Sequence, residues 1–384
     1  MPLGAVVEFK GGGTPNRKVS EYWDGGIPWA TVKDFNTGNL LKATKEFISE
    51  YGLTNSATRL IPKGTVIIPT RMALGKAVIA NIDVTINQDL KAVIPCSQVN
   101  PKYLLWFFIC NSAHIESLGK GATVKGVTLE QLRRLHIRLP PLPEQRRIAA
   151  ILDKADALRQ KRREAIAKLD QLLQSVFLEM FGDPVTNPKG WKTKSLDESS
   201  QNLKRGPFGG ALKKEIFVAD GYKVYEQQHA ISADFSIGRY FIDGAKFREM
   251  EAFSIRPNDL IVSCSGTMGR VAVAPTGVQP GVINQALLKI TLNEHLLRSE
   301  FGADCLRTTR MQSHLFGISR GSGLKNFPPM SDVRSLRMII PPIEQQEKYL
   351  DIKAHIEKMR IAFIRAEMND LFSSLQQRAF TGHL

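Results

Sequence analysis

Cysteine is scarce in this chain. Its 384 residues include only Cys96, Cys110, Cys264 and Cys305, and no two of them form a C-x-x-C pair. Zinc ribbons and disulfide frameworks need closely spaced cysteines, so the sequence argues against both, and no metal site is predicted. Four widely separated thiols are expected to stay reduced, as they do in a cytoplasm.

Long apolar runs are also missing. The most apolar stretch, Tyr103-Leu-Leu-Trp-Phe-Phe-Ile-Cys110, is far shorter than the roughly 20 residues that span a bilayer, and it predicts a buried helix or strand. The N-terminal residues MPLGAVVEFK lack the basic start and apolar core of a signal peptide. We therefore expect a soluble cytoplasmic protein with no membrane partner.

Motifs of catalysis and nucleotide binding are absent or fragmentary. No G-x-x-x-x-G-K-[ST] phosphate loop occurs, and no H-E-x-x-H spacing occurs among the seven histidines. Phe9-Lys-Gly-Gly-Gly13 only loosely resembles a methyltransferase cofactor loop, and Asp89-Leu-Lys91 is half of a nuclease site without the Pro-Asp dipeptide. The sequence therefore favours a protein that recognises and binds a ligand, rather than an enzyme. No catalytic residue is predicted.

Positive charge is abundant. Lys and Arg total 52 against 37 Asp and Glu, a formal net charge of +15. Such an excess favours a polyanionic partner, with nucleic acid ahead of an acidic membrane surface.

An internal repeat organises the whole chain. Residues 118–181 return in drifted form at 317–380, and both copies contain a proline-led segment, Leu139-Pro-Pro-Leu-Pro143 and Ile340-Pro-Pro-Ile343. Proline is tolerated in the first turn of a helix, and Gly182 and Gly382 stand where a left-handed C-cap is expected. Two helices of about 38 residues are predicted, each roughly 57 Å long.

Apolar residues recur within both helices at alternating steps of three and four, which is the a/d seam of a coiled coil. The simplest partner for each helix is the other copy, paired antiparallel. The predicted seam consists of Ile148, Ile151, Ala155, Leu158, Leu169, Leu172, Tyr349, Ile352, Ile356, Met359 and Phe363.

Two globular regions separate the helices. Both contain short apolar runs broken by Gly, Pro and Asn, which predict mixed strands with a few helices. Ile86-Asn-Gln88 matches Ile283-Asn-Gln285, whereas the intervening sequences diverge. We predict an α+β fold with globular domains at 1–139 and 184–340 and spacer helices at 140–183 and 341–384.

Three segments are specific enough to indicate a family: PPLPEQRRIAAILDKADAL…LLQSVFLEMFGDP, the opening GGGTP…YWDGGIPWATVKDF and the second PPIEQQ…AF block. Through them the chain resembles type I restriction–modification specificity subunits over essentially its whole length. This resemblance implies two target-recognition domains that read a bipartite, asymmetric DNA sequence, and paired helices that set the spacing. It also implies double-stranded DNA, two methyltransferase subunits and restriction (translocase) subunits as partners. S-adenosylmethionine, ATP and Mg²⁺ would belong to those partners, with no cofactor in this chain. The second block reads Glu344-Gln-Gln where the first reads Pro143-Glu-Gln, so the second helix start is expected to differ in detail.

Basic and amide side chains beside glycines, in the divergent parts, are the predicted DNA contacts. In the first half these are Lys10, Arg17, Lys18, Lys33, Arg71, Lys76, Gln88 and Lys125; in the second half they are Lys204, Arg205, Lys213, Lys214, Gln227, Gln228, Arg270, Gln285 and Lys325. Lys125 and Lys325 each follow a glycine by four positions and are expected to grip the phosphate backbone.

Three functions remain open at this stage. A non-catalytic specificity subunit is the leading hypothesis, a self-contained DNA methyltransferase or nuclease is the alternative, and a structural coiled-coil protein is the third. The basic face of the first helix has three possible roles: a solvent-exposed flank of the coiled coil, a contact with DNA between the half-sites, or a docking surface for an acidic partner.

Overall fold

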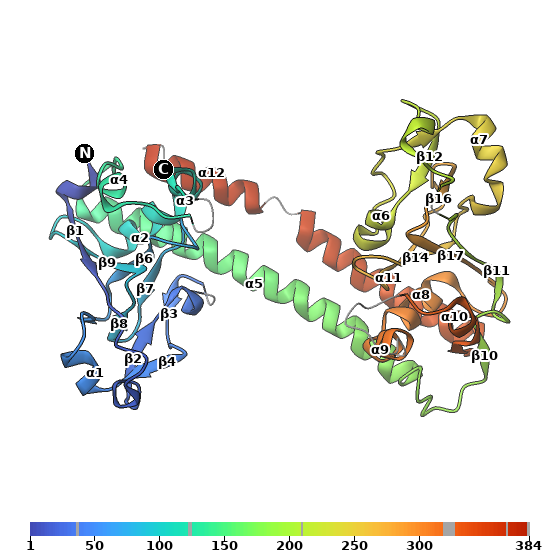
Figure 1. Cartoon of the computed structure of the whole chain (residues 1–384), viewed down its shortest axis with the longest axis horizontal. Coiled ribbons are helices and arrows are strands. Elements are labelled where there is room, and N and C mark those ends of the chain that lie inside the picture. The colour runs from blue at the N-terminus through green and yellow to red at the C-terminus, as the bar shows by residue number, and fades with distance from the viewer. Residues whose placement is uncertain (36–37, 122–124, 209, 318–326, 366–367, 382–384) are drawn as a thin grey trace. The chain divides into compact units, whose positions relative to one another are not determined.

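The computed structural model describes residues 1–35, 38–121, 125–208, 210–317, 327–365 and 368–381 (Figure 1). The chain packs as two compact units. Unit 1 comprises Met1–Glu164 and Ala366–Leu384, and unit 2 comprises Ala165–Arg365. Each spacer helix is therefore shared between the two units, whereas the predicted domain boundaries followed the helix ends.

Two sheets form the frame of unit 1. One has the strand order β1-β9-β6-β7-β3 and the other β4-β2-β8-β5. The strands are β1 (Val7–Gly11), β2 (Ile27–Ala30), β3 (Leu40–Leu41), β4 (Glu46–Ile48), β5 (Leu60–Ile61), β6 (Val66–Pro69), β7 (Val78–Ala80), β8 (Val84–Ile86) and β9 (Leu90–Pro95). The short helices are α1 (Glu50–Thr54), α2 (Pro101–Cys110), α3 (Ser112–Leu118) and α4 (Leu129–Arg133).

Unit 2 repeats this frame. Its main sheet has the order β11-β17-β14-β15, its second sheet the order β13-β12-β16, and β10 pairs with β18. The strands are β10 (Thr193–Ser195), β11 (Ser200–Arg205), β12 (Tyr222–Tyr225), β13 (Phe241–Ile242), β14 (Leu260–Ser263), β15 (Val271–Val273), β16 (Gly281–Ile283), β17 (Leu287–Leu292) and β18 (Arg337–Ile339). The short helices are α6 (Gln227–Ser232), α7 (Gly244–Glu249), α8 (Ser299–Arg307), α9 (Thr309–Gly317) and α10 (Met330–Ser335).

Corresponding strands pair in the same sense in the two units. β1 with β9 and β11 with β17 are antiparallel, whereas β2 with β8 and β12 with β16 are parallel. In unit 1 Gly11 faces Lys91, and in unit 2 Arg205 faces Leu288. The duplication read from the helices therefore extends to the topology of the globular parts.

The apolar run at 103–110 is a helix in the structure. Asn100 caps α2 by accepting hydrogen bonds from the backbone N–H groups of Lys102 and Tyr103 (3.0 and 3.1 Å), and Pro101 occupies the first turn. Side chains from Tyr103 to Phe108 are buried and join the core of unit 1. The cap and the proline explain why this run is not a strand.

The first spacer helix, α5 (Leu142–Phe181), is 40 residues long and begins within the predicted proline segment. It ends at Gly182, whose φ of +75° and N–H bond to the Leu178 carbonyl (2.8 Å) are those of a left-handed C-cap. The second helix is described as α11 (Ile343–Arg365) and α12 (Met368–Thr381), and Gly382 lies outside the described residues.

Two buried glutamines, Gln145 and Gln346, fix both helix starts in the same way. Each side chain is 0% exposed. Its Oε1 accepts a hydrogen bond from the backbone N–H that precedes α2 or α8 (2.8 and 2.9 Å), and its Nε2 donates to two backbone carbonyls (2.8–3.0 Å). α11 begins 201 positions after α5, so the two starts share their position, whereas their surface ion pairs differ: Arg147 pairs with Glu144 in α5, and Glu347 of α11 pairs with Arg298. The shared glutamine, not the differing Pro143 or Glu344, makes the internal contacts.

The spacer helices pack in antiparallel order, as the sequence predicts. In unit 1, Ile148 and Leu152 of α5 share a core with Phe372 of α12. In unit 2, Phe177 near the end of α5 has its ring centroid 5.5 Å from that of Tyr349 near the start of α11. The α+β class with paired long helices is confirmed.

Burial along the predicted seam is uneven. Ile148, Tyr349 and Ile356 are buried, and Ile151, Ala155, Leu169 and Ile352 are partly buried. Leu158, Leu172, Met359 and Phe363 remain 56, 45, 46 and 42% exposed. The seam stays a prediction at these four positions.

Candidate nucleic-acid interface

In each unit, loops that follow or connect the strands lie close together. We call the group of loops in unit 1 turn cluster 1 and the group in unit 2 turn cluster 2. Turn cluster 1 consists of residues 11–14, 30–33, 70–75 and 87–89; turn cluster 2 consists of residues 205–208, 225–228, 264–269 and 284–286.

Backbone hydrogen bonds hold turn cluster 1 together. Gly13 N donates to the Ile86 carbonyl at the end of β8 (2.9 Å), and Asn87 N donates to the Ala30 carbonyl (3.0 Å). Thr70 N donates to the Asp89 carbonyl (2.8 Å). These bonds satisfy main-chain donors and acceptors of the cluster within the cluster itself.

Turn cluster 2 repeats two of these bonds, from Asn284 N to the Tyr225 carbonyl (2.9 Å) and from Cys264 N to the Ala286 carbonyl (2.8 Å). Gly206 N donates instead to the Leu287 carbonyl (2.8 Å). The duplicated asparagines also act alike. The side-chain oxygens of Asn87 and Asn284 each accept a bond from the N–H two residues on, at 3.1 and 3.0 Å.

Turn cluster 1 gathers several of the predicted contacts. Arg71 is 66% exposed and lies 3.8 Å from the Asp89 carboxylate, beside which Gln88 accepts a hydrogen bond from the Thr14 hydroxyl. The Lys125 carbonyl accepts a bond from Met72 N (3.2 Å), which places this predicted phosphate contact next to Arg71. Lys33 is exposed in the cluster, Lys10 lies in β1, and Lys76 directly follows the 70–75 segment.

Two hollows open beside Arg71 and Asp89, of about 420 and 410 Å³. Gln88 and Lys91 also line the larger hollow, and Lys120 lines the smaller one. Burial lowers the pKa of the Lys91 ammonium, although the Asp89 carboxylate opposes this effect. Lys91 and Lys120 were not among the residues predicted from the sequence; Lys120 stands between Gly119 and Gly121 in the repeated segment that begins at residue 118.

Turn cluster 2 gathers Arg205, Gln227, Gln228 and Gln285, with Arg270 directly after it. The Gln227 Oε1 accepts a hydrogen bond from the Ser265 hydroxyl (3.0 Å), which ties two of its segments together. The Arg205 guanidinium carbon lies 5.3 Å from the ring centroid of Phe327, and Lys204 Nζ lies 4.8 Å from that of Phe253.

The other predicted residues are placed differently. Arg17 bonds to both Glu46 carboxylate oxygens (2.5 and 3.0 Å) and stacks over Trp23 at 3.7 Å. The hydrogen bond from Arg17 lowers the pKa of Glu46, so this pair stays charged and mutually neutralised. Lys18, Lys213 and Lys214 are exposed outside the two clusters, and Lys325 lies outside the described residues.

Two exposed apolar side chains in the clusters were missed by the sequence analysis. Met72 is 56% exposed with a φ of +64°, and Phe208 is 96% exposed. A search restricted to basic and amide side chains cannot find them, and only burial in the folded chain distinguishes them from core residues.

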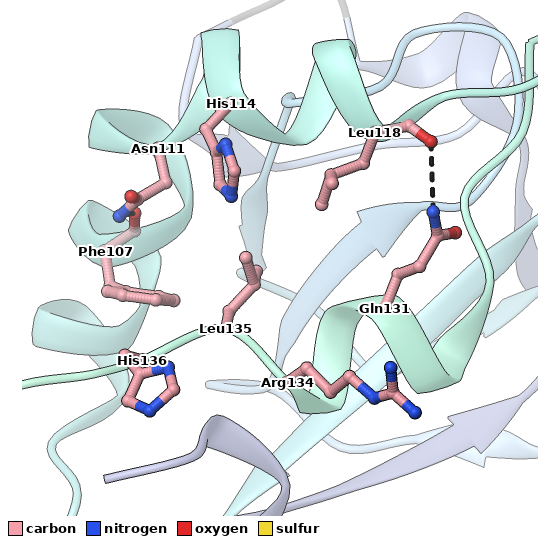
Figure 2. A pocket seen from close by; sticks show the side chains of 8 residues that line it. All are labelled: Phe107, Asn111, His114, Leu118, Gln131, Arg134, Leu135 and His136. Atoms are coloured by element: carbon pink, nitrogen blue, oxygen red, sulfur yellow. Dashed lines mark hydrogen bonds between the residues drawn. The ribbon is translucent and has the colours of Figure 1, made fainter.

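A separate hollow of about 490 Å³ lies at α2, α3 and α4 of unit 1 (Figure 2). Figure 2 shows His114, His136 and Arg134 around it, and Gln131 donating a hydrogen bond to the Leu118 carbonyl (3.2 Å). None of the predicted DNA contacts lines this hollow.

Neither a metal-binding group nor a membrane span is found in the described part of the chain. There, no three His, Cys, Asp or Glu side chains are grouped to hold a metal ion. No described helix is long and apolar enough to cross a bilayer.

Comparisons with known proteins point in one direction. Residues 1–168 match the family described as type I restriction modification DNA specificity domain. The chain is 25% identical over 375 residues to the type I restriction enzyme MjaIX specificity subunit of Methanocaldococcus jannaschii, an alignment covering 90% of this chain and 83% of that protein. It is 31% identical over 182 residues to the EcoR124I/EcoR124II specificity subunit of Escherichia coli, covering 46% and 45% of the two chains. Its fold matches, with a TM-score of 0.63 and 18% identity, a solved structure from work on assembly and conformational transition of the type I restriction–modification system, covering 100% of this chain and 97% of that one.

Proposed function

We propose that the chain is a specificity subunit of a type I restriction–modification system and that its two turn clusters read the two halves of a split DNA target. The observation that carries the proposal is the duplication itself. Equivalent backbone bonds support both clusters, but the side chains they present differ, for example Arg71 against Ser265 and Thr14 against Phe208. A common frame with different side chains suits two readers of unlike sequences.

In this proposal the chain binds double-stranded DNA and performs no catalysis. Residues 1–139 and 184–340 serve as target-recognition domains, and the helices at 140–183 and 341–384 act as spacers. Two methyltransferase subunits dock on the chain, and restriction (translocase) subunits join the larger complex. S-adenosylmethionine, ATP and Mg²⁺ are used by those partners. The excess of positive charge supports binding to a polyanion.

Mapping methylated bases in a genome that carries this chain and its methyltransferase partner tests the proposal. The expected map is a split, asymmetric sequence with half-sites about one helical turn (~34 Å) apart. Replacing residues 1–139 with the equivalent domain of a related subunit should change one half of that sequence only. A continuous palindrome, or methylation by this chain without any partner, would contradict the proposal.

A further inference from the structure

Phe208 is the most exposed large apolar side chain in the described part of the protein, at 96%. It lies in turn cluster 2, just after β11. Scattered apolar residues on a surface are ordinary and carry no function by themselves. Three features of the surrounding chain set Phe208 apart.

The first feature is the fixed backbone beneath the ring. Gly206 and Pro207 are buried, and Gly206 N is bonded to the Leu287 carbonyl. The Phe208 carbonyl accepts bonds from Gly210 N (2.7 Å) and Ala211 N (3.3 Å). The backbone of Phe208 is thus bonded in place at the end of β11, so little backbone entropy would be lost when the ring meets a partner.

The second feature is charge of a single sign. Residues 204–214 contain Lys204, Arg205, Lys213 and Lys214, and the first acidic residue after Phe208 is Glu215. DNA carries negative phosphates on the outside and apolar stacked bases between them. An exposed phenyl ring surrounded by Lys and Arg side chains matches both features, because the cations can bind phosphates while the ring contacts bases. A hydrophobic protein partner does not require this concentration of one charge.

The third feature is asymmetry between the units. Strand register equates Arg205 with Gly11, so Thr14 occupies the place of Phe208 in turn cluster 1. Its hydroxyl donates to the Gln88 side chain, so the place of Phe208 is taken by a polar residue, and the exposed apolar side chain of turn cluster 1, Met72, comes from a different segment.

We infer that Phe208 is a specificity-determining residue that contacts the base pairs of the half-site read by unit 2. The inference rests on the proposed function. The ring either enters a base step and unstacks it, or packs against the methyl group of a thymine, and both contacts recognise an apolar surface of the bases. The half-site read by unit 1 receives no such contact from Thr14.

The test uses the full chain in complex with its methyltransferase partner and a duplex carrying the target found by methylation mapping. Adenines are replaced one at a time by 2-aminopurine, whose fluorescence rises on unstacking, and thymines by uracil, which lacks only the methyl group. Phe208→Ala is compared with Phe208→Thr, which installs the residue found in unit 1. Phe47→Ala, at a 42% exposed phenylalanine of unit 1 outside the clusters, is the matched control.

We expect Phe208→Ala and Phe208→Thr to weaken target binding about ten-fold or more, the scale of a lost aromatic–base contact, while Phe47→Ala has no such effect. In the wild-type complex, one position of the second half-site should show either a fluorescence rise or a loss of affinity on uracil substitution. Both Phe208 variants should abolish that response. The thermal unfolding temperature should not change, because the ring is exposed.

Other results would overturn the inference. Unchanged affinity and unchanged probe responses in Phe208→Ala would exclude a base contact, and a loss of bound methyltransferase would make Phe208 a protein contact instead. If the wild-type complex fails to distinguish the target from a scrambled duplex, the proposed function itself fails, and this outcome is separate from the first two.

Discussion

Among single residues, Gly206 shows how closely two backbone segments approach in turn cluster 2. A Cβ placed there would lie 1.8 Å from the Asn284 carbonyl oxygen, and at the equivalent Gly12 it would lie 2.0 Å from that of Ile86. No side chain larger than hydrogen fits at either place unless the backbone moves. The presence of glycine is therefore a condition for the shape of both clusters.

Replacing Gly206 by alanine should push the end of β11 away from the 284–286 turn. We expect the free energy of unfolding to fall by about 2 kcal/mol, as for other overpacked sites, and recognition of the second half-site to be lost before that of the first. Gly210→Ala is the control, since its Cβ would meet no atom closer than 4.0 Å. Urea unfolding and a methylation map measure the two effects. Equal behaviour of the two variants would show that the close approach does not matter.

Met72 adopts a backbone conformation that side chains rarely take. Its φ is +64°, and the structurally equivalent residue of unit 2, Gly266, has a φ of +56°. A non-glycine residue in this region costs about 1–3 kcal/mol. Met72→Gly should therefore raise the free energy of unfolding by about 1 kcal/mol after the entropy cost of glycine is subtracted. Met72→Ala keeps the backbone cost and should leave stability unchanged within about 0.5 kcal/mol. If both variants unfold at the same urea concentration, the backbone of Met72 is not strained.

At the scale of elements, Lys353 joins α11 to α8. Its Nζ lies 2.7 Å from the Glu300 carboxylate and 2.8 Å from that of Asp304, and only 5% of the residue is exposed. Tyr349 donates a further bond to Asp304 (2.8 Å). Burial acts to lower the pKa of Lys353, but the two carboxylates outweigh it and the net pKa is raised. The ion cluster therefore holds the start of the second spacer helix on unit 2.

Lys353→Met should lower the free energy of unfolding by about 2 kcal/mol, because the partly buried Asp304 carboxylate loses one of its two cations and keeps only Arg307, 2.7 Å away. A raised folded pKa means that the stabilisation is fully present below the ordinary value of 10.5 and is lost only as the pH rises through the folded value. The loss in the variant should therefore be the same from pH 6 to 8 when followed by urea unfolding. Lys358→Met, at an exposed position of the same helix, should change stability by less than about 0.5 kcal/mol. If both variants lose a similar amount of unfolding free energy, the ion cluster around Lys353 does not stabilise the helix start as inferred.

Elements with local signals were predictable from the sequence. The proline segments and Gly182 mark the ends of α5, and the 201-residue offset of the duplication relates the start of α11 to that of α5. The convergence of loops was not predictable, because bonds such as Gly206 N to the Leu287 carbonyl join residues 81 positions apart. Exposure also follows from tertiary packing, so Leu158 and Phe208 look alike in sequence to buried apolar residues.

For the whole molecule, the spacer helices should determine the distance between the half-sites. Ile356 of α11 is only 4% exposed, so a charged side chain there would have to be buried or would force the helix away from its neighbours. We expect Ile356→Asp to loosen the helix pair and to broaden the number of unspecified bases in the methylation map, while each half-site sequence is retained. Met359→Asp is the matched control, because Met359 belongs to the same predicted seam but is 46% exposed. A map with one fixed gap in Ile356→Asp, or the loss of one half-site with the gap unchanged, would mean that something other than this helix pair sets the spacing.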